Sequence, residues 1–449
     1  MTLKRIYGAG AADPSIVVDS WWEASANPMR HAIAPLQGSH NFDVAVIGGG
    51  FTGLNAAKHL ALAGTNVCVA EAGHIGWGAS GRNGGFCANN STKKSLSEIA
   101  AQYGMDELHK TVRVQEDAIE QVRSFCTQAG ITSDTPDKNA ELAVAHTPYQ
   151  FKQLRSESDE LNQLLDLKTT VMDKHELTEY GAGSPAFHGG MIFPWGFGLH
   201  PLNYLRALAD STIDAGATLS QQTEIQSVTH ENGQYILSAP NTKICAKKLV
   251  IATNGYTAES IPGWSKGRLL PVASNILVTR PITADEQARQ GWTTYNMTYD
   301  TRTLLHYFRL LPDGRMMFGG RGAINDNLAK RQNFFTELRR QFDDIFPDWA
   351  NIGTDYQWSG FVCLNRKKSQ FLGPIDSDGT AWASLAYHGS GVAMASWSGK
   401  TIAKLVLGQT TLADLPRLYT DPTNRFPFAF LRSQYLKLAY AYYQQTDKR

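Results

Sequence analysis

The spacing of apolar residues predicts a chain that alternates between strands and helices. Near its start, an apolar run over 42–47 is followed by helical spacing over 52–63 and a second apolar run over 66–70. Two strands joined by such a helix form a βαβ unit, which requires a parallel sheet. Residues 382–408 predict another strand, a glycine-rich turn and a helix. We therefore expect early and late segments to share one doubly wound sheet.

The middle of the chain shows other periodicities. Helical spacing covers 96–129 and 151–165, whereas 270–320 alternates between apolar and polar residues as antiparallel strands do. Further helices are predicted over 201–215 and 333–346. A chain of 449 residues exceeds the usual size of one domain. We predict an α/β fold, in which a Rossmann-like domain is interleaved with a second domain built on an antiparallel sheet.

Glycines cluster where the first predicted strand meets the first helix. The run GGGFTG places Gly48, Gly50 and Gly53 in the spacing G-x-G-x-x-G, with Phe51 and Thr52 between them. The first glycine allows a tight turn, the second lets the backbone approach a pyrophosphate, and the third lets the helix pack closely on the strand. Unpaired N–H groups at the start of the helix favour phosphate. This strand–loop–helix context predicts a dinucleotide site.

An acidic residue closes the second predicted strand. Glu71, followed by Ala72, lies about 20 residues after the glycines, where a carboxylate can accept hydrogen bonds from ribose hydroxyls. This carboxylate favours FAD or NAD over NADP, and the spacing alone would also suit an NAD-dependent dehydrogenase. A second glycine-rich loop over 76–86, GWGASGRNGGF, favours FAD, because a flavin extends much further along the protein.

These motifs resemble the D-amino-acid oxidase superfamily of flavoproteins, in the branch that includes gamma-glutamylputrescine oxidase. The resemblance covers nearly the whole chain and includes, in the family's order, GGGFTGL, GWGASGRNGG, GLHPLNYLRALA, LVIATNGYT, RMMFGGR, WSGF and YHGSGVAMASWSGKTIAKLVLG. It implies a non-covalently bound FAD. Together, the resemblance and the periodicities predict four parts of the chain. These are an N-terminal arm over 1–40, an FAD-binding domain over 41–95, 196–268 and 356–425, a substrate domain over 96–195 and 269–355, and a C-terminal helix over 426–449.

The resemblance also implies which residues meet the cofactor, in four groups. Along the diphosphate and the approach to the flavin it implies Ser80, Gly81, Arg82, Asn83 and Gly84. At the adenine edge it implies Ile225, and for the wall near the ribose it implies Thr253, Asn254 and Gly255. Near the pyrimidine end of the ring it implies Gly389, Ser390, Gly391 and Val392. A helix is predicted to begin at this last group, so its N-terminus can stabilise negative charge on the ring.

The superfamily's chemistry implies few obligatory side chains. An amine C–H gives a hydride to flavin N5, water hydrolyses the imine, and oxygen reoxidises the flavin with release of hydrogen peroxide. No general base is strictly required, so the candidate catalytic residues follow from position. Tyr307 and Arg309 share one face of a predicted strand, and Arg309 could bind a substrate carboxylate or be an ordinary sheet arginine. Lys368 and Arg321 are candidates for oxygen activation or anion stabilisation, and His388 for the edge of the ring.

Two loops depart from the family's usual pattern. In AYHGSG, His388 stands where the family has serine, and in RKKSQF, Lys368 replaces arginine. These changes leave FAD binding expected and the substrate open. Sarcosine oxidases attach their flavin through a cysteine in this general region. Cys363 aligns with alanine in the closer pattern, so a buried small apolar residue is favoured over a covalent link.

Composition and charge narrow the expected partners and location. The formal net charge is +1 and basic residues do not cluster, so nucleic acid is not expected. The five cysteines are widely spaced without a C-x-x-C pair, which indicates neither a disulfide framework nor a metal site. Reduced thiols, no apolar leader and no spanning segment predict a cytoplasmic protein. The sequence leaves open whether the protein forms a homo-oligomer.

The expected function is oxidation of a small-molecule amine or amino acid, with an amine such as gamma-glutamylputrescine as the first choice. Alternatives within the same chemistry are an oxidase of L-pipecolate or L-proline type, and a dehydrogenase that passes electrons to a quinone or carrier instead of oxygen. A hypothesis from a different functional class is a non-catalytic FAD-binding subunit, and the two altered loops suggest it.

Overall fold

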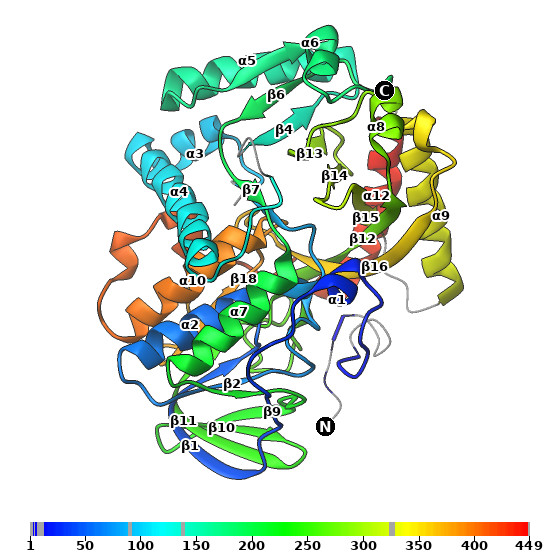
Figure 1. The fold of residues 1–449 in the computed structure, drawn as a ribbon. Coiled ribbons are helices and arrows are strands. Elements are labelled where there is room, and N and C mark those ends of the chain that lie inside the picture. The colour runs from blue at the N-terminus through cyan, green and yellow to red at the C-terminus, as the bar shows by residue number, and fades with distance from the viewer. Residues whose placement is uncertain are drawn as a thin grey trace.

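Two large sheets organise the molecule, one in the lower half and one in the upper half of Figure 1. The computed structural model describes residues 3, 5–6, 13–88, 92–135, 140–322 and 328–447. Each sheet takes strands from separate stretches of the chain, so the chain passes between the two several times. The predicted interleaved α/β fold is confirmed.

The lower sheet is mostly parallel. Its strands in spatial order are β17 (Phe371–Pro374), β18 (Ala381–Leu385), β11 (Thr242–Ile251), β1 (Gly38–Ile47), β2 (Val67–Ala70) and β8 (Thr218–Ser220). Strands β18 to β8 run parallel, β17 is antiparallel, and a hairpin of β9 (Ser227–Glu231) and β10 (Gln234–Ala239) extends β11. In β1, Val44 and Val46 pack into one apolar cluster and Ala45 and Ile47 into another. Both faces of this sheet are covered, as a parallel sheet requires.

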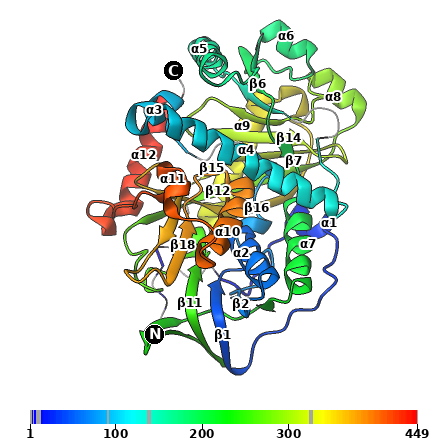
Figure 2. The ribbon, with the colours of Figure 1, turned by 90° about the vertical axis from the view of Figure 1, so that its left-hand side faces the viewer.

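Helices cover one face of the lower sheet (Figure 2). Its strands contact α2 (Phe51–Leu62), α7 (Pro201–Asp214), α10 (Gly391–Val406) and α11 (Arg417–Thr420). Outside these, α4 (Met105–Gln128) packs on α10 and α11, and α3 (Leu96–Tyr103) packs on α4 and α11. Helix α2 contacts α7 and α10, and α10 also contacts α4. The predicted helix over 96–129 is interrupted at Gly104, whose φ of 92° ends α3 before α4 begins. Helix α2 follows β1, and α10 follows β18. The first turns of both helices therefore lie beside the carboxyl ends of parallel strands.

The upper sheet is almost entirely antiparallel. Its strands in spatial order are β16 (Thr354–Asn365), β12 (Leu269–Pro281), β15 (Arg315–Gly322), β14 (His306–Leu310), β13 (Met297–Asp300), β4 (Glu141–Val144), β6 (Gly189–Phe193) and β5 (Thr170–Asp173). Only the pair β13 and β4 is parallel among its neighbours. Its helices are α5 (Pro148–Leu165), α6 (Lys174–Glu179), α8 (Ala284–Gln290) and α9 (Leu328–Ile345). Phe308, Phe318 and Phe346 pack between this sheet and α9.

Strand β16 lies in the upper sheet along its whole length. It pairs with β12 from Asn365 opposite Leu269 to Thr354 opposite Thr279. The expected start of the last FAD-binding segment at 356 therefore falls inside a strand of the upper sheet. The alternation in this stretch is weak, because several of its side chains are half-buried on both faces. The other domain boundaries stay predictions.

Shorter elements complete the fold. They are α1 (Trp21–Ser25), β3 (Phe86–Cys87) paired with β7 (Phe197–Gly198), α12 (Arg432–Thr446), and the 3₁₀ turns η2 (Ala79–Gly81), η3 (Asn254–Tyr256), η4 (Pro347–Trp349), η5 (Leu412–Asp414) and η6 (Ala429–Leu431). In the N-terminal arm, Trp22 is buried and its indole donates to the carbonyl of Asn83 at 2.8 Å. The arm is thus fastened to the second glycine-rich loop.

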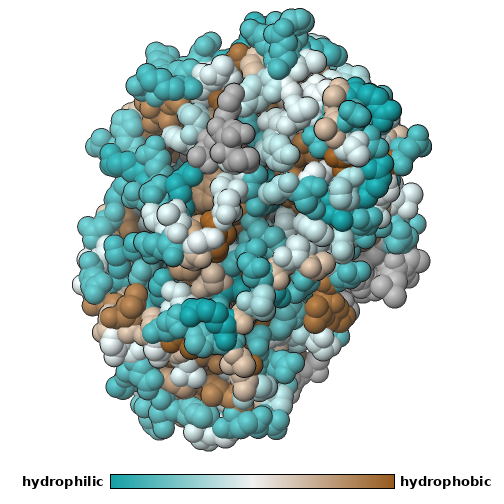
Figure 3. All heavy atoms as spheres, in the orientation of Figure 1, coloured by the Kyte–Doolittle hydropathy of each residue, from teal (hydrophilic) through white to brown (hydrophobic). Residues whose placement is uncertain are grey.

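The face of the molecule drawn in Figure 3 is mostly polar, with scattered apolar side chains. The described helices include none that is both long and apolar enough to span a bilayer. Toward the C-terminus, the large apolar side chains with the highest exposed fractions are those of Phe428, Phe430 and Leu438.

Candidate functional site

A cavity between the two sheets is lined by both glycine-rich loops and by the face of the upper sheet. Of the predicted cofactor residues, those that line it are Gly48, Gly50, Phe51, Thr52, Glu71, Ala72, Ser80, Arg82, Asn83, Gly84, Ile225, Thr253, Asn254, Gly389, Ser390, Gly391 and Val392. The predicted residues that do not line it are Gly53, Gly81, Gly255, Arg309 and Lys368. Elements far apart in the sequence therefore meet at one place.

The first glycine loop turns sharply from β1 into α2. Gly48 has a φ of 106°, which favours glycine, and a Cβ there would lie 2.9 Å from the carbonyl oxygen of Ala252. A Cβ on Gly53 would lie 1.9 Å from the carbonyl oxygen of Gly48, so this glycine serves packing of the helix on the loop. No side chain caps α2 at Gly50. Its first-turn N–H groups and positive dipole end face the cavity.

Glu71 lies beside this loop with its carboxylate partly satisfied. One oxygen accepts from the N–H of Gly49 at 2.6 Å and the other from the N–H of Gly73 at 3.1 Å. Burial raises the pKa of Glu71, and these two N–H groups oppose the shift. A carboxylate offers about four acceptor positions, so roughly two stay available for hydroxyl groups in the cavity.

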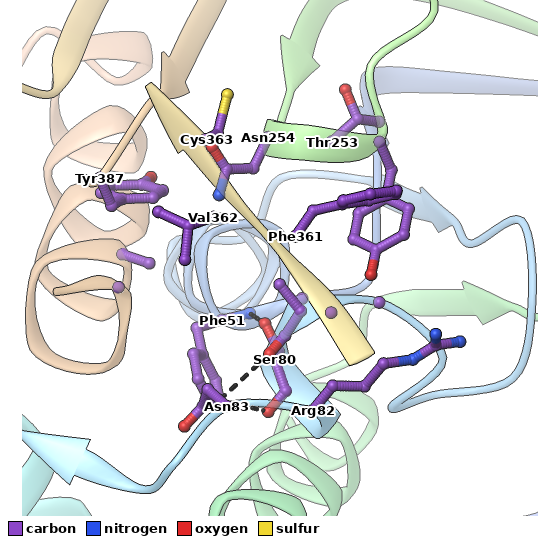
Figure 4. Close-up of a pocket in the computed structure, with 18 of the residues that line it drawn as sticks. Phe51, Ser80, Arg82, Asn83, Thr253, Asn254, Phe361, Val362, Cys363 and Tyr387 are labelled. Carbon is purple, nitrogen blue, oxygen red and sulfur yellow. Dashed lines mark hydrogen bonds between the residues drawn. The ribbon is translucent and has the colours of Figure 1, made fainter. Parts of the chain in front are cut away.

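The second glycine loop is tied to the first (Figure 4). Ser80 Oγ accepts from the N–H of Phe51 at 3.1 Å, and Asn83 Nδ2 donates to the carbonyl of Ser80 at 2.9 Å. A Cβ on Gly81 would lie 2.1 Å from the carbonyl oxygen of Gly76, so this turn closes only with glycine there. Arg82 lines the cavity, and its buried Nε has no hydrogen-bond partner among the described residues. The loop thus places a cation beside the N-terminus of α2, whose first N–H group is bound by Ser80.

A third loop, between β18 and α10, reaches the cavity in a constrained conformation. Ala386, His388 and Gly389 have φ values of 64°, 55° and 116°. Asn254 Oδ1 accepts from the N–H of Ala386 at 2.8 Å, which joins this loop to the turn after β11. No side chain caps α10 at Ser390, so a second helix N-terminus opens onto the cavity.

His388 is a neutral, buried side chain in this loop. Its Nε2 lies 3.1 Å from Asn365 Oδ1, and Asn365 Nδ2 donates to the carbonyl of Ser369. Burial lowers the pKa of His388 to about 3, with Lys93 and Arg321 adding to the shift. The sequence departure at this position therefore adds no charge to the cavity at neutral pH.

The upper sheet presents one polar side chain from each of five strands to the cavity: Ser274, Arg321, Tyr307, Tyr299 and Glu141. Tyr299 pairs with Tyr307, and Ser274 pairs with Arg321, so the register places each pair on one face. Tyr307 donates to or accepts from Ser274 Oγ at 2.8 Å. A Cβ on Gly319 would lie 2.2 Å from the Tyr307 ring, so glycine there lets the ring lie across β15.

Charges of both signs border this face. Glu141 is buried, and burial raises its pKa to about 8. Lys93 borders the cavity, where partial desolvation of its ammonium group and the nearby Arg321 cation lower its pKa to about 8, although much of the side chain is exposed. Arg321 lies beside the third loop, since a Cβ on Gly389 would be 3.2 Å from its guanidinium. The cavity therefore contains two cations and one carboxyl group at this end.

Two candidate catalytic residues lie elsewhere. Arg309 is fully buried: it pairs with Asp134 at 2.9 Å and donates to the carbonyls of Gly84 and Leu199. The structure therefore places Arg309 away from the cavity, and its guanidinium holds the second glycine loop. Lys368 is exposed and does not line the cavity.

The sequence reasoning missed Lys93, Glu141, Ser274 and Tyr299. Lys93 follows the second glycine loop and belongs to no motif. Glu141 opens the apolar strand ELAV, and a lone charge at the start of such a strand was the available signal. The pairing of β4 with β13 could not be read from the sequence, because these strands lie more than 150 residues apart.

Cys363 lines the cavity as a thiol. It is buried, and burial raises its pKa to about 12. A thiol with so high a pKa is a poor nucleophile, which favours a non-covalent cofactor. No group of three His, Cys, Asp or Glu side chains in the described parts of the chain could hold a metal ion.

The residues present fit a flavin dinucleotide. Two helix N-termini border the cavity, and Arg82 Nε has no hydrogen-bond partner among the described residues. Together with the glycine cradle they suit a diphosphate, and Glu71 suits a ribose. The fold and this cavity define a dinucleotide-binding flavoprotein.

Comparison with known proteins gives the family. Residues 43–405 match the model of the family described as FAD dependent oxidoreductase (DAO). The chain is 30% identical to the "probable oxidoreductase OrdL" of Rhizobium meliloti, over 96% of this chain and 97% of that protein. It is 28% identical to the gamma-glutamylputrescine oxidoreductase of Escherichia coli, over 96% and 98%. The chain belongs to the DAO family of FAD-dependent oxidoreductases, so the predicted family, enzyme class and cofactor are confirmed.

Solved structures share the fold. Glycine oxidase from Geobacillus kaustophilus superposes with a TM-score of 0.69 at 19% identity, over 83% of this chain and 96% of that one. L-Proline dehydrogenase from P. horikoshii superposes with a TM-score of 0.68 at 20% identity, over 85% and 97%.

Proposed function

We propose that this protein oxidises the amine of a small molecule that also carries a carboxylate, with gamma-glutamylputrescine as the first candidate. The observation that carries the proposal is the cavity face with Arg321 and Lys93 as cations and Glu141 as a carboxyl group. A molecule with an ammonium and a carboxylate would complement both signs. The name of the Escherichia coli relative supports the particular candidate.

The chain's own residues would bind and orient such a substrate. FAD, when bound, supplies the hydride acceptor for the C–H bond next to the amine. Arg321 is suited to a substrate carboxylate because its guanidinium can bind both oxygens. The Tyr299 and Tyr307 rings line the cavity and shield it from bulk water. The N-terminus of α10 would stabilise negative charge at the ring, while His388 stays neutral.

The cofactor contacts are part of the proposal. We infer that the two glycine loops hold the diphosphate, that Glu71 accepts from the ribose, and that Ile225 lies at the adenine. We also propose reoxidation by oxygen with release of hydrogen peroxide. A cytoplasmic location fits the five free cysteines, because a reducing compartment keeps thiols unpaired.

Anaerobic reduction of the purified holoenzyme tests the function. The panel contains gamma-glutamylputrescine, putrescine, glycine, sarcosine, L-proline and L-pipecolate, and the readout is loss of the flavin's visible absorption. We expect gamma-glutamylputrescine to reduce the flavin fastest, and colour to return rapidly in air with peroxide. If L-proline or L-pipecolate reduces the flavin faster, that amino acid replaces gamma-glutamylputrescine as the proposed substrate. A slow return of colour in air would indicate a dehydrogenase. No reduction by any amine would favour a non-catalytic subunit.

A matched pair of variants tests the carboxylate contact. Arg321→Met should weaken the binding of gamma-glutamylputrescine far more than the binding of putrescine, because putrescine has no carboxylate. Lys368→Met removes a cation outside the cavity and should change neither. Equal effects of Arg321→Met on both amines would contradict this contact.

A further inference from the structure

One buried carboxyl group in the cavity forms no hydrogen bond with the residues that the structure describes. Glu141 is 6% exposed and lines the cavity from the first position of β4. Its neighbours in register are Phe193 on β6 and Met297 on β13, which are apolar. No hydrogen bond or ion pair to its carboxylate occurs within the described part of the chain. A buried carboxylate without a partner is costly, so a fold alone gives no reason to keep it.

Glu141 shares the upper-sheet side of the cavity with other titratable or charged side chains. They are Lys93 after the second glycine loop, Arg321 on β15, Tyr299 on β13, Tyr307 on β14 and His388 before α10. Burial raises the pKa of Glu141 to about 8, and Lys93 opposes this shift. At neutral pH the free protein therefore holds this carboxyl group mostly protonated. His388 stays neutral over the same range, because burial lowers its pKa to about 3.

We propose that Glu141 binds the ammonium group of the substrate and accepts its proton, so that the amine is held neutral in the cavity. The inference rests on the proposed function and adds the chemical group that Glu141 recognises: a protonated amine. Glu141 first loses its own proton to solvent. The ammonium proton then passes from nitrogen to the carboxylate oxygen, giving a free amine and a carboxylic acid. No electron moves in this step, and no co-reactant is needed.

A proton balance follows. In the free state at neutral pH, Glu141 and the ammonium each carry a proton, whereas the bound pair shares one. Binding must therefore release the other proton to solvent. The number released equals the protonated fraction of Glu141, so it should approach one at a pH well below the pKa of about 8 and approach zero well above it.

Calorimetry of the holoenzyme measures this number without turnover. The flavin is reduced beforehand with dithionite under nitrogen, so the amine binds and cannot be oxidised. Gamma-glutamylputrescine is titrated in pairs of buffers with different ionisation enthalpies at each pH. We expect the wild type to release protons as given above. The Glu141→Gln variant should release no protons, and it should bind gamma-glutamylputrescine roughly 10- to 100-fold more weakly than the wild type at pH 8.

Three controls separate the carboxyl group from its surroundings. Glu141→Asp keeps a carboxyl group and should keep proton release. Lys93→Met removes the neighbouring cation that also titrates near pH 8 and should keep release as well. Gamma-glutamylbutylamide lacks the terminal amine and should release no proton in any variant. FAD content and the thermal midpoint of each variant confirm that it is folded.

The outcomes distinguish this inference from the proposed function. If the amine reduces the oxidised enzyme but Glu141→Gln still releases the wild-type number of protons, the proposed function stands and the inference is overturned. If Lys93→Met abolishes release while Glu141→Gln keeps it, Lys93 is the titrating group and the inference is equally overturned. If no amine binds to or reduces the wild type, the proposed function fails and the inference falls with it.

Discussion

The contact between α2 and α10 decides whether both helix N-termini can face one cavity. At the crossing, a Cβ on Gly399 would lie 2.2 Å from the carbonyl oxygen of Thr52 and 2.7 Å from Asn55 Cβ. Real Cβ atoms do not come closer than about 3.0 Å, so Gly399→Ala must separate the two backbones by about 0.8 Å at this point. The neighbour is backbone, so no side-chain rotation relieves the contact.

The expected cost of Gly399→Ala combines two effects. Overpacking of this kind costs about 1–3 kcal/mol of the free energy of unfolding. Alanine gains up to about 1 kcal/mol over glycine inside a helix, which offsets part of this cost. Because the contact is with backbone, the packing cost should win. The shift also moves Thr52, which lines the cavity, so FAD affinity should fall along with stability.

Gly353→Ala provides the matched control. Gly353 is exposed, and a Cβ there would meet nothing within 4 Å. We expect its stability to stay within about 0.5 kcal/mol of the wild type. Chemical denaturation of the apo-protein and fluorescence titration with FAD measure the two effects. Equal unfolding curves and equal FAD affinities for Gly399→Ala and Gly353→Ala would refute the packing argument.

Further predictions concern charge and the cofactor link. Arg309→Met leaves Asp134 buried without its partner and should destabilise the apo-protein by about 3–5 kcal/mol in chemical denaturation, and an effect below about 1 kcal/mol would contradict the buried pair. Acid precipitation of the holoenzyme should release all FAD into the supernatant, because the high pKa of the Cys363 thiol disfavours a covalent link; yellow pellet would disprove this. The pKa of His388 is lowered to about 3 from an ordinary value of 6.5, so the unfolded state binds a proton that the native state does not, and stability should fall as the pH falls from about 6.5 toward 4. His388→Asn, which tolerates the φ of 55°, should lose less stability between pH 7 and pH 5 than the wild type, as denaturation at both pH values would show.

The sequence predicts the dinucleotide-binding half well because its signals are local. A strand, a glycine turn and a helix follow one another between Phe42 and Leu62, so each element carries its own evidence. Glycine positions are also specific: Gly48 and Gly53 are fixed by contacts within the same unit. Glu71 follows at a set distance. Nothing remote is needed to place these residues in a single site.

The substrate end of the cavity depends on pairings that no local pattern records. Arg309 and Tyr307 share a face, as alternation predicts, but only the packing of the second glycine loop decides which of them reaches the cavity. Lys368 lies in a polar loop whose direction depends on its φ of 64°. Glu141 reaches the cavity through the register of β4 on β13. Each of these outcomes is set by contacts between segments distant in the chain.

The loop before α10 explains how the second helix N-terminus is held in place. Ala386 and His388 adopt left-handed φ values without being glycine, which costs of order 1 kcal/mol or more each. Such a conformation persists only where surrounding contacts over-determine it. Asn254 accepts from the N–H of Ala386, and Asn365 contacts the His388 ring, so both strained residues are fixed from outside the loop. The dipole end of α10 is thus oriented before any ligand arrives, and a preoriented dipole needs no reorganisation when negative charge develops beside it.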